Sequence, residues 1–324
     1  SANILKNAMG VGIPGTGMIG LPIAVALGAL VGRSEYQLEV LRDVSREAVE
    51  RGKQYIAEGR IHIALEEHDP DKLYIRCRCT AQGHEAEAVI KRRHTQFVLV
   101  SRDGQTLYSR QAEAETDDDG GQVPLALRLV YDFAVETDVE DLRFILEARR
   151  LNEQASDDGL RDNYGHSLGK TMCSPLGRGI MGESIFAKIL SRTSCACDAR
   201  MAGAMIPVMS NSGSGNQGIC ATMPVVVFAE ENHNTEEELI RALIMSNLTA
   251  IYIKQHLGSL SALCGCVVAS TGSSCGITYL MGGTYEQVAW SVKNMIANLT
   301  GMICDGAKPS CALKLTTGVG TAVM

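Results

Sequence analysis

Cysteines near the C-terminal end of the chain are the residues whose spacing most clearly indicates chemistry. Cys304 and Cys311 lie seven residues apart in GMICDGAKPSC, on either side of Asp-Gly and Lys-Pro. Such a pair can be a disulfide, two packed core thiols or two ligands of one metal site. The opening SANILKNAMG lacks the layout of a secretory signal, so we expect a cytoplasmic protein, in which a disulfide is disfavoured.

The absence of close CxxC pairs around these cysteines weakens a zinc site. An iron–sulfur cluster is large and its thiolates converge from different elements, so it tolerates irregular spacing. Cys264 or Cys266, some forty residues upstream of Cys304, would supply a third thiolate. Spacing alone therefore leaves both cluster ligands and packed thiols open, and the other cysteines are expected to be packing residues.

A second segment with chemical potential is MSNSGSGNQG, residues 209–218. Nine consecutive residues from Ser210 are Ser, Asn, Gln or Gly, as in an exposed linker, yet the apolar ICATMPVVVFAEE follows at once and indicates entry into the core. Hydroxyl, amide and glycine N–H groups suit the carboxylate and ammonium of an amino acid. The predicted substrate-binding residues here are Ser210, Asn211, Ser212, Ser214, Asn216 and Gln217.

Further candidates are more isolated. The glycine-rich GVGIPGTGMIG at 10–20 precedes an Ala-rich helix, and Gly15, Thr16 and Gly17 could offer backbone amides to an anion, although the spacing fits neither a dinucleotide fingerprint nor a P-loop. Arg200 in CDARMAG could pair with a carboxylate, or with Asp198 in a surface ion pair. His94 ends a predicted strand, and it and Arg200 are the candidate catalytic residues; the general base is not identified.

The elements that must position these residues follow from hydrophobic periodicity. Residues 1–58 read as helical and are assigned to the main body. Residues 59–122 read as an antiparallel β domain of four to five strands, with a turn at Asp103-Gly104, followed by the acidic linker AEAETDDDGGQ, expected to be a surface loop. Residues 123–324 read as the helical catalytic body. The predicted class is α+β, a predominantly helical body with an inserted antiparallel sheet.

Composition limits the partners. The net charge is −7 and the densest basic cluster is KRRH at 91–94, which argues against nucleic acid as a partner. Leu257 to Tyr285 carries no charge, but its Gly, Ser, Thr and Cys content is poor for a membrane span. We therefore expect no membrane insertion and interpret this stretch as a buried helical hairpin.

Four stretches together resemble one family. They are NILKNAMGVGIPGTGMIGLPIAVALGAL, SNSGSGNQGICATMPVVVFAE, LSALCG and TGMICDGAKPSCALK, and in this order they resemble the UPF0597 family, which includes L-cysteine desulfidases and is related to the α-domain of iron–sulfur L-serine dehydratases. The resemblance implies a 4Fe–4S cluster held by Cys264, Cys304 and Cys311, with one iron open. Cys266 is the fallback for Cys264 because the sequence CGC leaves the register ambiguous.

The implied reaction is β-elimination of L-cysteine to pyruvate, ammonia and hydrogen sulfide, with the open iron acting on the leaving sulfur. One alternative is an L-serine ammonia-lyase with the same cluster. Another is a truncated, non-catalytic amino-acid-binding or structural subunit, since the family's upstream GCTEP-type motif and C-terminal helices lie outside this sequence. We expect a small-molecule amino acid as partner and a homodimer, with the sheet serving dimerisation or access to the site.

Overall fold

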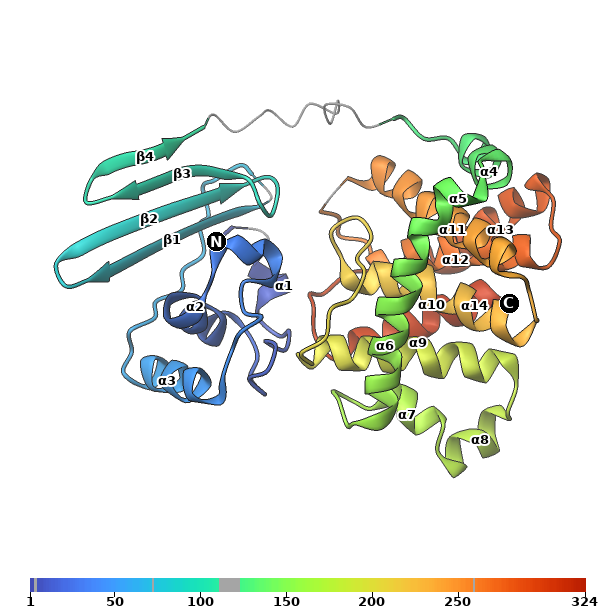
Figure 1. Cartoon of the computed structure of the whole chain (residues 1–324), viewed down its shortest axis with the longest axis horizontal. Coiled ribbons are helices and arrows are strands. Elements are labelled where there is room, and N and C mark those ends of the chain that lie inside the picture. The colour runs from blue at the N-terminus through green and yellow to red at the C-terminus, as the bar shows by residue number, and fades with distance from the viewer. Residues whose placement is uncertain (3–4, 72, 111–122, 259) are drawn as a thin grey trace. The chain divides into compact units, whose positions relative to one another are not determined.

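The computed structural model of this chain describes residues 1–2, 5–71, 73–110, 123–258 and 260–324. It divides into two compact units, Ser1–Val123 and Pro124–Met324, each described here by itself (Figure 1). The predicted α+β class is confirmed, with helices throughout and one antiparallel sheet. The assignment of residues 1–58 to the helical body stays a prediction, and the acidic linker falls almost entirely outside the described residues.

The first unit combines short helices with the sheet. Its elements are α1 (Leu5–Ala8), α2 (Leu21–Val31), the 3-10 helix η1 (Ser34–Glu39), α3 (Arg46–Ala57), β1 (Tyr74–Ala81), β2 (His84–Lys91), β3 (Phe97–Arg102) and β4 (Gln105–Ser109). The four strands form an antiparallel meander in the order β1-β2-β3-β4, as Figure 1 shows. One face of the sheet packs Tyr74, Val89 and Val98 together with Ala2.

Two-residue turns set the register of this meander. Asp103 and Gly104 have φ of 50° and 78°, and Gln82 and Gly83 have φ of 53° and 80°, the two positive values that a type I′ hairpin needs. The predicted hairpin at Asp103-Gly104 is therefore confirmed. The stretch RIHIALEE at 60–67, in contrast, is not a strand, because its backbone bonds to Ser1 at Ala64 and Glu66 instead of extending the sheet.

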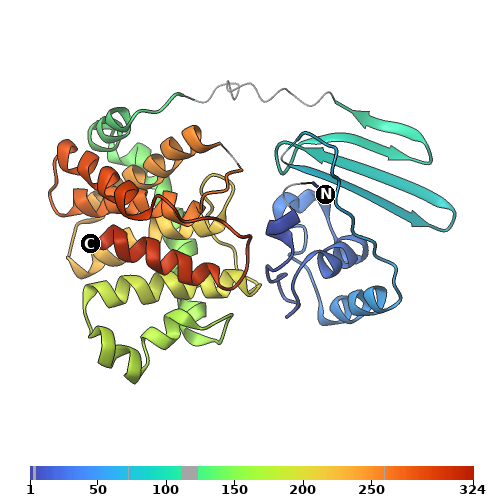
Figure 2. The same cartoon turned by 180° about the vertical axis from the view of Figure 1, so that it is seen from behind.

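The second unit is helical. Its elements are α4 (Leu127–Glu136), α5 (Val139–Leu142), η2 (Arg143–Ile145), α6 (Leu146–Arg161), α7 (Leu168–Met172), α8 (Pro175–Met181), α9 (Ile185–Met201), α10 (Gly215–Glu231), α11 (Glu236–Leu257), α12 (Gly265–Leu280), α13 (Tyr285–Leu299) and α14 (Cys311–Val323). Thr235 caps α11 through a capping box with Glu238. Figure 2 shows α14 lying along α9, and α14 also packs against α12.

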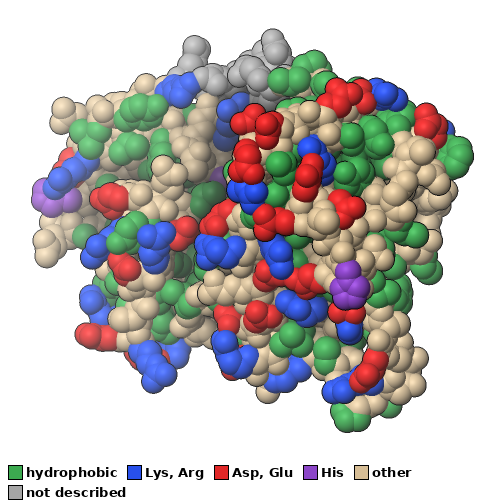
Figure 3. All heavy atoms as spheres, turned by 45° about the vertical axis from the view of Figure 1, so that its right-hand side comes forward, with side chains coloured by type: hydrophobic (Ala, Val, Ile, Leu, Met, Phe, Trp, Pro, Cys, Tyr) green, Lys and Arg blue, Asp and Glu red, His purple; other side chains and the backbone are tan. Residues whose placement is uncertain are grey.

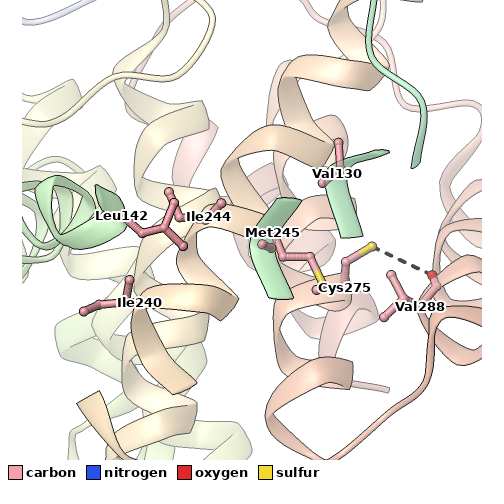
Figure 4. Packing of buried hydrophobic residues seen from close by; sticks show 8 residues of the cluster. Val130, Leu142, Ile240, Ile244, Met245, Cys275 and Val288 are labelled. Carbon is pink, nitrogen blue, oxygen red and sulfur yellow. Dashed lines mark hydrogen bonds between the residues drawn. The ribbon is translucent and has the colours of Figure 1, made fainter. Parts of the chain in front are cut away.

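Small residues allow α12 to lie deep in this unit. A Cβ on Gly272 would come within 2.2 Å of the Ser246 carbonyl oxygen on α11, so only glycine permits that crossing. Next to it, Cys275 packs among Val130, Met245 and Val288, and its thiol donates to the Val288 carbonyl at 3.9 Å (Figure 4). The prediction of a helical hairpin from Leu257 to Tyr285 is wrong, because this stretch is one helix between the end of α11 and the start of α13.

The surface carries charges of both signs. On the face seen in Figure 3, acidic and basic side chains are interspersed over the helical unit. None of the described helices combines the length and the apolar character that crossing a bilayer requires.

Candidate functional site

Cys264 and Cys304, forty residues apart in sequence, are brought side by side by a short antiparallel bridge. The Cys264 N–H donates to the Met302 carbonyl at 3.0 Å, and the Cys304 N–H donates to the Ala262 carbonyl at 2.8 Å. Leu263 and Ile303 form the bridge between these bonds. The two predicted cluster cysteines therefore lie on paired backbone segments just before α12 and α14.

Cys311 joins them as the first residue of α14. The connection turns at Gly306, where φ is 101°, and the Cys311 N–H then donates to the Lys308 carbonyl at 2.8 Å. Burial raises the pKa of the Cys311 thiol, and the thiols of Cys264 and Cys304 raise it further. Three thiols thus share one electrostatic environment, with Asp-Gly and Lys-Pro forming the bend between two of them.

The fallback residue Cys266 interacts with the thiols of Cys220, Cys264 and Cys311. Its pKa is raised first by a hydrogen bond with Cys220, and Cys220 lies on α10 in the fully buried interior. Cys264, in contrast, shares with Cys304 the charge of Lys314, which reaches the carbonyl of Ile303 at 2.9 Å. Lys314 thus interacts with Cys264 and Cys304, whereas Cys266 interacts with Cys264, Cys311 and Cys220, and the choice of Cys264 over Cys266 as the third ligand stays a prediction.

The chemistry of the three thiols fits a positively charged metal centre. Within the residues that the structure describes, no three His, Cys, Asp or Glu side chains converge closely enough to hold a single metal ion as they stand. The pKa of Cys264 is raised by its hydrogen bond with Cys266 and by burial, so this thiol stays protonated unless a cation compensates the thiolate. An iron–sulfur cluster supplies that compensation and spans more widely separated sulfurs.

Three helix N-termini meet around these thiols. The N-cap residues of α10, α12 and α14 are Ser214, Cys264 and Ser310, and none of the three helices receives a side-chain cap. The first N–H groups and the dipoles of α10 and α12 therefore present positive potential to an anion, whereas the first three N–H groups of α14 donate to the carbonyls of Lys308, Pro309 and Ser310. Thiolates and an amino-acid carboxylate are both stabilised by such an arrangement.

The polar segment at residues 209–218 lies next to Cys264 as well. Asn211 to Ser214 close a tight turn, with φ of 48° at Ser212 and 77° at Gly213, and α10 begins at the next residue. A Cβ on Gly265 would come within 2.8 Å of the Gln217 amide, so Gln217 packs directly against the residue that follows Cys264. The Gln217 Oε1 atom is buried without a hydrogen-bond partner. Gln217 is thus a polar group beside the thiols that a ligand would satisfy.

Other residues of this segment are partly engaged by the protein. The Asn211 amide donates to the Asn247 carbonyl at 3.1 Å and to its side-chain oxygen at 3.0 Å. Ser212 and Ser210 are exposed, and the Ser212 hydroxyl donates to Asn211 Oδ1 at 2.8 Å. Asn211 therefore holds the turn in place, while the hydroxyls of Ser210 and Ser214 form no hydrogen bond to protein within the described residues.

Arg200 lies against the first turn of α10. Its guanidinium donates to Asn216 Oδ1 at 3.0 Å, and a Cβ on Gly215 would come within 2.2 Å of its Nε. Burial lowers the pKa of Arg200, and the thiols of Cys197, Cys266 and Cys311 act in the opposite direction. The surface ion pair with Asp198 is a wrong alternative, because Asp198 is only 1% exposed and makes no such bond.

Four predicted residues belong to the first unit. Thr16 is buried and its loop closes on itself, since the Thr16 N–H donates to the Ile13 carbonyl at 3.2 Å and its hydroxyl to the same carbonyl at 2.7 Å. Gly15 and Gly17 adopt φ of 72° and 64° in this loop. His94 is exposed in the turn between β2 and β3. Their roles in binding or catalysis stay predictions.

Lys314 was missed by the sequence interpretation. It forms ion pairs with Asp305, which in turn pairs with Lys308, and the two lysines hold the pKa of Asp305 well below its ordinary value. The available signal was its position three residues after Cys311, which places both side chains on one face of a helix. This group adds a cation beside Cys264 and Cys304.

Comparison with known proteins identifies the class. The profile of the family described as serine dehydratase alpha chain matches residues 35–324. The chain therefore belongs to the serine dehydratase alpha chain family. Its relatives within that class include the UPF0597 proteins, so the resemblance inferred from the four motifs is confirmed.

These relatives are similar along the whole chain. The UPF0597 protein of Bacteroides thetaiotaomicron is 66% identical over 324 residues, which is all of this chain and 76% of the relative. That of Porphyromonas gingivalis is 50% identical over 329 residues, covering all of this chain and 76% of the relative. That of Shewanella halifaxensis is 44% identical over 327 residues, covering all of this chain and 75% of the relative. No solved structure matches the chain.

Proposed function

We propose that the chain is a cytoplasmic, homodimeric lyase that converts L-cysteine and water into pyruvate, ammonia and hydrogen sulfide. The family is that of serine dehydratase alpha chains, which supports a lyase acting on a small amino acid. The proposed cofactor is a 4Fe–4S cluster held by Cys264, Cys304 and Cys311. When bound, its open iron would act as a Lewis acid toward the leaving sulfur.

The observation that supports this proposal is the placement of Cys264 and Cys311 at the starts of α12 and α14, with Cys304 paired through its backbone to the segment before α12. Uncapped N–H groups of α10 and α12 can bind the substrate carboxylate next to the thiols. The buried and unpartnered Oε1 of Gln217 can accept a hydrogen bond from the substrate ammonium. The substrate would then lie with its β-substituent toward the cysteines.

The protein's own groups fix this orientation before the substrate arrives. Asn216 is held by Arg200, Asn211 is held by Asn247, and the turn between them begins α10 at a defined place. Such pre-organisation lowers the entropic barrier of elimination, because the Cα–H and Cβ–S bonds must be aligned when they break.

The proposal is tested by anaerobic reconstitution with iron and sulfide, followed by assay of L-cysteine turnover. We expect pyruvate and sulfide in equal amounts, together with visible absorbance of a thiolate-bound cluster. Replacing Gln217 by Met should weaken turnover, because it removes the oxygen that accepts the hydrogen bond of the substrate ammonium. Cys79→Ser, an exposed cysteine of β1, is the control and should behave as wild type. Iron-loaded protein that releases neither pyruvate nor sulfide would contradict the proposal.

The family description favours L-serine as the second candidate substrate. The same orientation would place a hydroxyl where the thiol of L-cysteine lies, and water would leave instead of sulfide. Parallel assays with the two amino acids separate the candidates, since both yield pyruvate and ammonia but only L-cysteine yields sulfide. A higher kcat/KM for L-serine would select the second candidate.

A further inference from the structure

Asp198 is a buried carboxyl group of which only one oxygen has a hydrogen-bond partner in the described residues. It lies on α9 with 1% of its surface exposed. Its Oδ2 accepts a hydrogen bond from the Gly169 N–H at 3.1 Å, whereas its Oδ1 is buried and has no partner. Burying a carboxyl oxygen without a hydrogen bond is unfavourable. A side chain near Asp198 Oδ1 that donates a hydrogen bond to it in another state of the site would remove this cost.

Asp198 Oδ1 lies close to Gly165, which in turn contacts Pro309 in the loop between Cys304 and Cys311. A Cβ on Gly165 would be 3.6 Å from Asp198 Oδ1 and 3.4 Å from Pro309. Gly165 belongs to the connection between α6 and α7, and Pro309 to the connection between Cys304 and Cys311. Asp198 therefore lies at the point where the cysteine loop meets a second loop of the helical unit.

That second loop presents a histidine. His166 follows Gly165, is exposed, and sits in a backbone bent by φ of 54° at Gly165 and 49° at Ser167. Burial raises the pKa of Asp198 to about 6, whereas the amides of Gly169 and Leu168 and the charge of His166 lower it. On α9 itself, the charge of Asp198 raises the pKa of two thiols, those of Cys195 and Cys197. His166, next to the Gly165 that approaches Asp198 Oδ1, is thus the titratable group outside α9 whose charge acts on Asp198.

We infer that Asp198 is a positioning residue that orients His166 as the proton acceptor at the edge of the cysteine site. An imidazole N–H is the donor that Asp198 Oδ1 lacks, and catalytic hydrogen bonds are often long or absent before substrate binds. The inference rests on the proposed function and supplies the general base that sequence left unidentified.

In this step the imidazole of His166 takes the α-proton of the amino acid. The electron pair of the Cα–H bond becomes the Cα=Cβ bond, the Cβ–S bond breaks, and sulfide leaves with its electron pair. The imidazolium that forms is stabilised by the Asp198 carboxylate, and it returns its proton to the leaving group or to solvent. No oxidant or reductant is consumed.

The test compares His166→Ala and Asp198→Asn with wild type in the iron-loaded chain. We expect both variants to keep the iron content and absorbance of wild type. We expect kcat to fall by about 10²-fold or more for His166→Ala, with partial rescue by added imidazole. Exchange of the substrate α-proton with deuterated solvent should be lost in parallel. His233→Asn, another exposed histidine of the helical unit, is the matched control and should keep wild-type activity.

A second readout does not need the cofactor. In the unloaded chain, the infrared band of the protonated Asp198 carboxyl, identified by its loss in Asp198→Asn, is followed against pH. Removing His166 removes a nearby positive charge, so His166→Ala should raise the pKa of Asp198, while His233→Asn should not. An unchanged carboxyl titration, or wild-type α-proton exchange in His166→Ala, would overturn the inference. Failure of wild type to bind iron or to release pyruvate would instead count against the proposed function.

Discussion

Replacing Asp198 by Asn should make the protein more stable at neutral pH, although Asp198 is almost completely buried. Asparagine has nearly the same shape, and its side-chain oxygen can accept the bond from the Gly169 N–H. What the change removes is a carboxylate that the interior disfavours, because burial raises its pKa from 3.8 to about 6.

The size of the effect follows from that shift. A difference of about two pKa units between the folded and unfolded chain corresponds to about 3 kcal/mol of lost stability at pH 7. Because the folded-state pKa is the higher one, the folded chain keeps its proton longer. The contribution of Asp198 to stability is therefore fully retained below pH 3.8 and is lost as pH rises through about 6.

Asparagine does not recover the full stability of about 3 kcal/mol. Its amide N–H₂ would lie in the place of Oδ1, where it too would lack a hydrogen-bond partner. We expect a gain of about 1–3 kcal/mol at pH 7.5, or roughly 3–10 °C in Tm for a helical unit of this size. The assay is thermal and urea unfolding of the unloaded wild type and variant between pH 4 and pH 8. The difference should shrink toward pH 4. A variant that is less stable than wild type by a constant amount across this range would refute the reasoning.

Three further substitutions test the packing and the caps that position the site. Gly272→Ala should destabilise the helical unit by about 1–3 kcal/mol in urea unfolding, because its Cβ would meet the Ser246 carbonyl at 2.2 Å. Gly179→Ala, a helical glycine with nothing within 4 Å of its Cβ, is the control and should gain up to about 1 kcal/mol; equal effects would contradict the packing account. Thr235→Ala should lose about 1 kcal/mol by opening the capping box of α11, and an unchanged urea midpoint would argue against it. Arg200→Met should raise KM for the amino acid more than it lowers kcat, since it frees Asn216; an unchanged KM would count against that role.

Local sequence signals were sufficient where short-range physics decides the structure. The hairpin at Asp103-Gly104 and the cap at Thr235 were predictable because each depends on residues within a few positions. The helical hairpin predicted from Leu257 to Tyr285 failed because small residues and the absence of charge indicate burial but not the number of helices. RIHIALEE failed because its alternation suits a strand while its backbone bonds to the N-terminus.

The candidate site shows the same division. Cys304 and Cys311 could be singled out from their spacing and their motif, but their meeting with Cys264 depends on a bridge between residues forty apart. Asp198 could not be predicted as buried, because a charged residue two positions from an arginine reads as a surface ion pair. Its environment is made by Gly165, Gly169 and Pro309, which come from other elements of the helical unit.

The most direct test of the central claim is the iron content of single cysteine variants after anaerobic reconstitution. The proposed ligand set predicts about four irons per wild-type chain, and loss of iron and of visible absorbance in Cys264→Ser, Cys304→Ser and Cys311→Ser. Cys266→Ser and Cys79→Ser should keep both. Wild-type iron content in Cys304→Ser and Cys311→Ser would contradict the claim that these thiols hold the cluster.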